Sequence, residues 1–250
     1  MLDIVDETIC VETGLADKRE TSRFLKTVLR QRLSGDFLFL DADTVAVAPL
    51  DHLFKTTADF CALPMRGTRK NQPTRNEVGR VYQALGWRWP LKILYNSGVM
   101  FFRDTPAARM LGDEWHQRWR ETLGIGCVLD EPALNRAIDV LRVSCEDLTP
   151  RYNALVLGWP GLFRTCAIAH FLESCETGIT LMSHLVQVAK SSRTMDWAAY
   201  DRCITEGHPW APNPAAWQLW RSKNYGRALT AKLKKTLRPG CEAQYRSKML

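Results

Sequence analysis

Residues 37–47 read Phe-Leu-Phe-Leu-Asp-Ala-Asp-Thr-Val-Ala-Val, and this stretch decides the fold class. Four consecutive apolar residues without alternation are typical of a buried parallel strand. Asp41 and Asp43 follow at the carboxyl end of that strand, where open α/β sheets bind their ligands. Residues i and i+2 of an extended chain point the same way, and two like charges repel each other. A hard divalent cation that also holds a diphosphate would remove the repulsion.

The rest of the chain alternates between strand and helix patterns. Strand patterns follow at residues 60–63 and 94–102, and helix patterns lie at residues 17–33, 105–123 and 131–141. This alternation predicts an α/β fold with a Rossmann-like, mostly parallel sheet flanked by helices. Only residues 4–11 offer a strand before the first helix, so the opening strand of the fold is expected to be truncated. Residues 65–80 are polar and basic and predict a loop.

The charge of the chain is uneven. The net charge is +7, but residues 221–250 hold nine Lys or Arg and one acid, a local net of +8. Residues 1–220 therefore carry −1, which argues against a core built to bind nucleic acid. We expect one domain over residues 1–220 and a basic tail over residues 221–250.

The cysteines and the chain start favour a cytoplasmic protein. The eight cysteines are scattered without a Cys-x-x-Cys pair, as in proteins whose thiols stay reduced. The first residues are acidic, unlike a signal peptide, and no apolar run is long enough to span a membrane.

Six segments then stand in a specific order. They are Ser-Arg-Phe-Leu-Lys at 22–26, Leu-Asp-Ala-Asp-Thr at 40–44, Tyr-Asn-Ser-Gly-Val at 95–99, Asp-Glu-Pro-Ala-Leu-Asn at 130–135, Arg-Tyr-Asn at 151–153 and Ala-His-Phe at 169–171. Together they resemble the retaining nucleotide-sugar glycosyltransferases of family 8, the glycogenin and lipopolysaccharide galactosyltransferase group. An acidic doublet alone is common, whereas this whole series over residues 17–175 is much more specific.

The resemblance implies an A-type glycosyltransferase fold with Mn²⁺ or Mg²⁺ at the Asp-x-Asp. It implies that Asp41 contacts the donor ribose and the metal, that Asp43 binds the metal, and that His170 is the third protein ligand. The other implied site residues are Arg23, Ala42 and Ser97 for the donor and Asn96, Asp130 and Glu131 for catalysis.

The implied activity is transfer of a hexose from a nucleotide-diphosphate sugar to a glycan or lipid-linked acceptor, with retention, in polysaccharide biosynthesis. The chemistry suits the residues, because a metal neutralises the diphosphate leaving group and a carboxylate stabilises a cationic anomeric carbon. Two departures favour an alternative, a truncated, non-catalytic sugar- or metal-binding relative. The opening strand with its base-binding residues is missing, and Leu-Glu-Ser at 172–174 replaces a Gly and Lys-Pro-Trp segment. Glu131 also stands where the family usually has Gln.

Simpler interpretations of the same residues stay open. Asp130 could be a helix N-cap, and Glu131 a favourable acid in the first helical turn. The Asn-Ser-Gly at 96–98 could be a bulge in a strand. Arg23 could be a solvated helix residue, and His170 a core histidine.

The basic tail has two interpretations as well. Leu229, Leu233 and Leu237 lie four residues apart among lysines, with Trp220 and Tyr225 before them. Such a stretch suits an anionic membrane surface, which would make the protein peripheral at the inner face of the membrane. A solvated terminus explains the composition equally well. No motif supports nucleic-acid binding.

Overall fold

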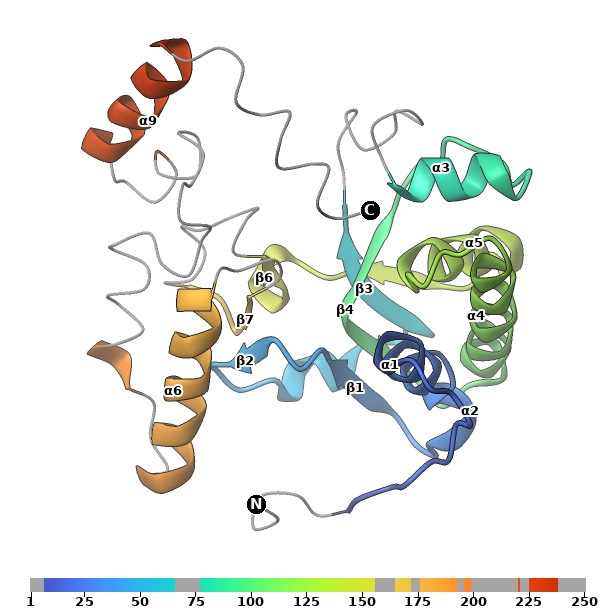
Figure 1. Cartoon of the computed structure of the whole chain (residues 1–250). Coiled ribbons are helices and arrows are strands. Elements are labelled where there is room, and N and C mark those ends of the chain that lie inside the picture. The colour runs from blue at the N-terminus through green and yellow to red at the C-terminus, as the bar shows by residue number, and fades with distance from the viewer. Residues whose placement is uncertain are drawn as a thin grey trace. The chain divides into compact units, whose positions relative to one another are not determined.

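The computed structural model describes residues 7–65, 77–155, 165–171, 176–192, 196–198, 220 and 225–237 (Figure 1). The chain divides into two compact units. Unit 1 comprises Met1–Phe39 and Leu53–Asp147, and unit 2 comprises Leu40–His52 and Leu148–Leu250. The domain boundary expected at residue 220 stays a prediction.

Unit 1 is built on a four-stranded sheet in the order β1-β4-β3-β5. The strands are β1 (Phe37–Leu40), β3 (Phe60–Pro64), β4 (Tyr95–Phe102) and β5 (Cys145–Asp147). β3 runs antiparallel to β4 and parallel to β5. The described sheet is therefore mixed, and the expectation of a mostly parallel sheet is corrected to a mixed α/β fold. The sheet is mixed because β4 runs antiparallel to its neighbour β3.

The helices of unit 1 follow the sequence patterns closely. They are α1 (Lys18–Thr27), α2 (Leu29–Arg32), α3 (Glu77–Ala84), α4 (Pro106–Gly124) and α5 (Glu131–Leu141), with a 3₁₀ turn η1 (Asp51–Lys55) at the unit boundary. The helix predicted over residues 17–33 is broken at Val28, and α4 and α5 match their predicted ranges. The loop predicted over residues 65–80 is wrong from Glu77 onward, because Val78 and Tyr82 bury an apolar helix face.

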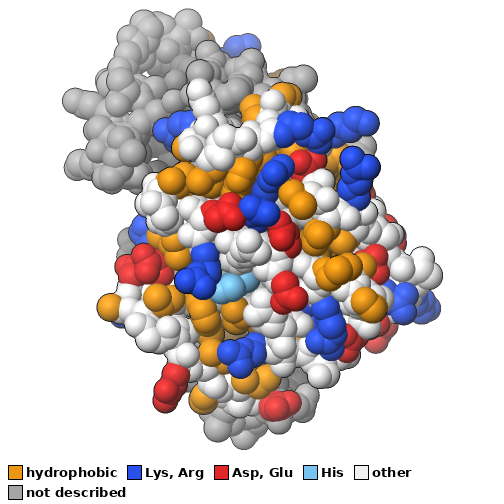
Figure 2. Space-filling view, turned by 90° about the vertical axis from the view of Figure 1, so that its right-hand side faces the viewer, with side chains coloured by type: hydrophobic (Ala, Val, Ile, Leu, Met, Phe, Trp, Pro, Cys, Tyr) orange, Lys and Arg blue, Asp and Glu red, His pale blue; other side chains and the backbone are white. Residues whose placement is uncertain are grey.

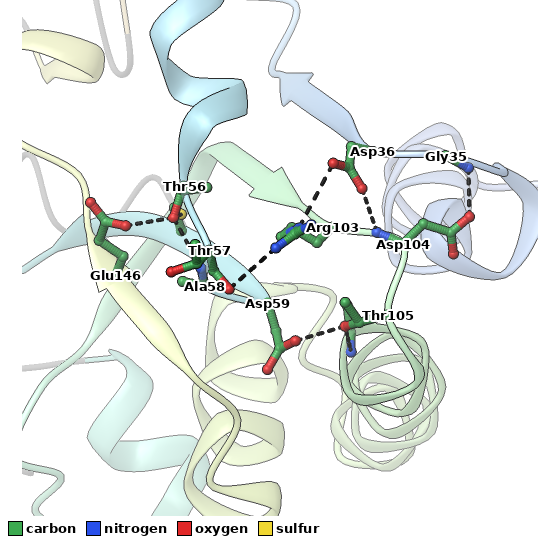
Figure 3. Close-up of polar contacts among 12 residues, drawn as sticks. Gly35, Asp36, Thr56, Thr57, Ala58, Asp59, Arg103, Asp104, Thr105 and Glu146 are labelled. Carbon is green, nitrogen blue, oxygen red and sulfur yellow. Dashed lines mark hydrogen bonds and ion pairs between the residues drawn. The ribbon is translucent and has the colours of Figure 1, made fainter.

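A polar network fixes one end of the unit 1 sheet (Figure 3). The carboxylate of Asp104 accepts a hydrogen bond from the Gly35 N–H at 2.6 Å, and the Asp104 N–H donates to Asp36 at 2.7 Å. The Thr105 hydroxyl donates to Asp59 at 2.7 Å and also caps α4. These bonds place the start of β1 beside the end of β4. Asp41 follows the other end of β1.

Arg30 is a buried cation that ties α2 to this network. Its guanidinium donates to the Gly35 carbonyl at 2.8 Å and lies 4.7 Å from the centre of the Phe37 ring. Gly112 of α4 packs against it so closely that a Cβ there would lie 2.7 Å from the Arg30 Cβ. The sequence therefore needs glycine at 112 for close packing rather than for an unusual backbone angle.

Unit 2 contains a three-stranded sheet in the order β2-β7-β6. Its described elements are β2 (Thr44–Ala46), the 3₁₀ turn η3 (Pro150–Tyr152), β6 (Ala154–Leu155), β7 (Ile168–His170), α6 (Glu176–Ser192) and α9 (Tyr225–Leu237). β7 pairs antiparallel with β2 and parallel with β6. Segments that are far apart in the sequence, 44–46 on one side and 154–155 with 168–170 on the other, thus meet in one small sheet.

Several sequence expectations concern other parts of the chain. Residues 7–11 form no strand, and residues 1–6, 172–174 and 205–217 lie outside the described part. The five described cysteines form no disulfide with one another. Among the described helices, none has the length and apolarity that crossing a membrane requires. On the face seen in Figure 2, Lys and Arg side chains lie among Asp and Glu side chains.

Candidate metal centre

The pairing of β2 with β7 brings the Asp-x-Asp to the histidine. Thr44 lies opposite His170 in the register of the two strands. The Phe171 N–H donates to the Asp43 carbonyl at 2.8 Å, which continues the ladder one step beyond the end of β7 and before the start of β2. The Thr44 hydroxyl and N–H both donate to the Asp41 carbonyl, at 2.7 and 3.0 Å, and close a tight turn. This turn directs two carboxylates toward one imidazole.

The three side chains form one cluster within unit 2. Asp41, Asp43 and His170 each offer a ligand atom, and these atoms all lie within 4.8 Å of one another. The Nε2 atom of His170 lies 3.2 Å from Oδ1 of Asp43. The His170 side chain is 1% exposed and the Asp43 side chain is 41% exposed. The cluster is therefore closed on the histidine side and open to solvent on the carboxylate side.

Asn153 orients the histidine. Its Oδ1 atom lies 2.7 Å from Nδ1 of His170, and both side chains are buried. Because a side-chain carbonyl only accepts, Nδ1 carries the proton in this bond. A neutral His170 therefore presents an unprotonated Nε2, and this buried atom makes no hydrogen bond within the described part of the chain. A second hydrogen bond of this kind is the usual support of a metal-binding histidine.

The donor set fits a divalent cation. Two carboxylate oxygens and one imidazole nitrogen face one another, and all three are electron-pair donors rather than hydrogen-bond donors. Such atoms repel at this distance unless a cation or a proton lies among them. Carboxylates favour Mg²⁺ and Mn²⁺, and the nitrogen ligand shifts the preference toward a transition ion such as Mn²⁺. Asp41, Asp43 and His170, which were predicted as metal ligands, are thus brought together.

A second cluster of charges lies within unit 1. Asp130 pairs with Arg23 through Oδ1 at 3.1 Å and with Lys26 through Oδ2 at 3.1 Å. The Lys26 ammonium also donates to the Ser97 hydroxyl at 3.2 Å. Burial alone would raise the pKa of the Asp130 carboxyl, but the Lys26 and Arg23 charges and the Ser97 hydroxyl outweigh it, so the pKa is lowered. Asp130 is therefore held ionised.

The simpler interpretations of these unit 1 residues have mixed outcomes. The N-cap interpretation of Asp130 is wrong, because its backbone is helical and its side chain pairs with cations instead of capping α5. Arg23 is not merely solvated, since it makes one of those pairs. The bulge at 96–98 is confirmed: the register shifts opposite this segment, and Asn96 accepts from the Gly98 N–H at 2.9 Å. Glu131 lies in the first turn of α5 as that interpretation expects.

Other predicted residues have no marked role in the described structure. Ala42 is exposed in the turn between the two aspartates. Residues 172–174, which replace the family's Gly and Lys-Pro-Trp segment, lie outside the described residues. The roles of Asn96, Ser97, Asp130 and Glu131 toward a sugar stay predictions.

The sequence did not single out three contacting residues. Lys26 lies three positions after Arg23, so the two side chains share one helical face. This spacing could have indicated that Lys26 acts together with Arg23. Asn153 was noted only as part of a motif. The Tyr95 hydroxyl donates to Asp147 at 3.0 Å, and no local pattern connects these two residues.

Comparison with known proteins adds little to this site. No family model matches the chain, and no curated protein matches it by sequence. Among solved structures, the apo form of mouse xyloside xylosyltransferase 1 is similar at 17% identity and a TM-score of 0.38. The match covers 60% of this chain and 63% of the length of that one. Overlap at this level carries no conclusion about family, so the function must be inferred from the residues of the site.

Proposed function

We propose that this protein is a metal-dependent glycosyltransferase that moves a hexose from a nucleotide-diphosphate sugar to a glycan or lipid-linked acceptor. The observation that carries the proposal is the cluster of Asp41, Asp43 and His170, with Asn153 behind the histidine. The order of motifs along the chain supports the sugar-transfer chemistry, the A-type fold and the retention of configuration.

The proposed ligands have separate tasks. Asp41 and Asp43 hold the cation from the solvent side, and His170 holds it from the buried side. A bound divalent cation acts as a Lewis acid toward the diphosphate that leaves the sugar. The solvent-open side of the cluster leaves space for phosphate oxygens, as three protein ligands do not complete an octahedral shell. Mn²⁺ is the proposed ion.

The unit 1 residues are proposed to handle the sugar. Arg23 and Ser97 offer a guanidinium and a hydroxyl, groups that bind the donor. Asn96, Asp130 and Glu131 are proposed as the groups that stabilise the cationic anomeric carbon. A cytoplasmic location is proposed on the composition of the chain.

The test is calorimetric titration of UDP into the full chain, with and without Mn²⁺. Metal-dependent binding in the wild type and its loss in Asp43→Ala are expected. Asp51→Ala is the matched control, because Asp51 is an exposed acid of the same unit outside the cluster. Equal UDP binding in the wild type and Asp43→Ala would refute the metal site.

A donor screen then separates the enzyme from the non-catalytic alternative. The wild type is incubated with Mn²⁺ and a panel of UDP-sugars, and the release of UDP is measured with glycan acceptors. Release that depends on Asp43 supports the transferase. UDP binding without release from any donor would favour the binding relative.

A further inference from the structure

Helix α9 of unit 2 carries an exposed apolar stripe. Tyr225, Leu229 and Leu233 lie four residues apart on one face, and their exposed fractions are 49%, 56% and 61%. Trp220 is 56% exposed, and its ring centre lies 4.9 Å from that of Tyr225. Ala228 of the same helix is buried, so the helix packs on one side while the stripe stays outside. Four large apolar side chains side by side in water are an unfavourable surface unless a partner covers them.

The same helix is strongly basic. Its thirteen residues include four Lys or Arg and no Asp or Glu. Arg227 and Lys232 are both exposed. The surrounding segment, residues 221–250, carries a net charge of +8 while the rest of the chain carries −1. Arg227 and Lys232 therefore accompany the exposed stripe on the same helix, within the most basic part of the sequence.

We propose that the stripe of Trp220, Tyr225, Leu229 and Leu233 docks onto an anionic lipid bilayer. A helix that lies in the membrane interface buries leucines below the headgroups and keeps lysines at the level of the lipid phosphates. Tyr and Trp favour that same interface, because each has an apolar ring and a polar group. A second copy of the chain is a poorer occupant, since two such helices would bring eight cations together.

Docking has a consequence for the acceptor. A lipid-linked acceptor is confined to the bilayer, so a docked enzyme would meet it at a high local concentration. This link to the acceptor rests on the proposed function, whereas docking itself does not. Membrane docking and the proposed transferase activity can therefore be refuted independently of each other.

The experiment is cosedimentation of the full chain with vesicles rich in phosphatidylglycerol, compared with vesicles of phosphatidylcholine alone. We expect at least about ten-fold tighter binding to the anionic vesicles. The double variant Leu229→Ser with Leu233→Ser is expected to lose about ten-fold of that affinity. Val186→Ser is the matched control, because Val186 is an exposed apolar residue on helix α6 of the same unit.

Three results would overturn the proposal. The first is sedimentation with neither vesicle. The second is unchanged binding of the double leucine variant, which would leave only charge attraction. The third is a wild-type dimer in size-exclusion chromatography that the leucine variants dissociate, which would identify a second copy as the occupant. Asp43→Ala should bind vesicles like the wild type, and this measurement separates docking from the metal site.

Discussion

Replacing Asn153 with leucine removes the residue that orients His170, the histidine of the candidate metal centre. Leucine has a similar volume, so the 2.7 Å contact to Nδ1 of His170 is lost without opening a large cavity. The imidazole then has no fixed choice of protonated nitrogen. In the tautomer with the proton on Nε2, the lone pair that should face Asp41 and Asp43 is gone. Asn153→Asp keeps the accepting oxygen and is the conservative counterpart.

The expected loss of metal affinity can be estimated from the usual contribution of a hydrogen bond to the second nitrogen of a histidine ligand. Loss of a hydrogen bond behind a metal ligand typically weakens metal affinity by about 10–100-fold, or about 1.4–2.7 kcal/mol. The buried Nδ1–H also loses its partner, which costs about 1–3 kcal/mol of folding stability. Asn153→Asp should bind Mn²⁺ at least as tightly as the wild type, because its added negative charge makes the imidazole a stronger ligand.

Two measurements check this prediction. The electron paramagnetic resonance signal of free Mn²⁺ gives the affinity, and ¹⁵N chemical shifts of the imidazole give the tautomer in metal-free protein. A thermal melt shows whether each variant is folded. The reasoning is refuted if Asn153→Leu binds Mn²⁺ within about two-fold of the wild type, or if Asn153→Asp binds it more weakly than Asn153→Leu.

Two further predictions concern stability. Gly112→Ala should destabilise the chain by about 1–3 kcal/mol in urea unfolding, because the new Cβ would lie 2.7 Å from that of Arg30. Gly124→Ala on the same helix meets nothing within 4 Å and should instead stabilise by up to about 1 kcal/mol, so equal effects would contradict the packing argument. Asp130→Asn should cost about 3–5 kcal/mol at neutral pH, because Lys26 loses its buried partner. Folding lowers the pKa of Asp130, so wild-type stability should fall as the pH drops from the ordinary carboxyl pKa of 3.8 through the lowered one. In melts recorded at several pH values, Asp130→Asn should lack the part of the acid-induced loss of stability that comes from this carboxyl group.

Local patterns were sufficient to predict much of the fold and the metal centre. The apolar run before Asp41 predicted β1 as a strand, and a proline in each first turn placed α4 and α5. The expected burial of that run is wrong, because β1 is an edge strand of the described sheet and its four residues are only partly buried. The Asp-x-Asp could be recognised because both carboxylates follow one strand. His170 was predicted only through the resemblance, and its position opposite Thr44 supports that prediction.

Pairings between distant segments could not be predicted. The direction of β4 depends on which strand it pairs with, and its apolar end, Val99–Phe102, fits a parallel sheet equally well. Asp130 stands at a helix start in the sequence, where an N-cap is the common role. Its true partners, Arg23 and Lys26, lie on another helix, and no period within either segment reveals the contact.

The two charge clusters differ in the kinds of atoms that face one another. In unit 1, the carboxylate of Asp130 already has two cations within 3.1 Å, so that cluster is stable with its own side chains. In unit 2, the facing atoms of Asp41, Asp43 and His170 are all electron-pair donors. Moreover, Asn153 holds the proton of the imidazole on the far nitrogen. In the neutral tautomer that this bond favours, Nε2 of His170 carries a lone pair toward Asp43. The three side chains are therefore arranged so that they could hold a divalent cation among them.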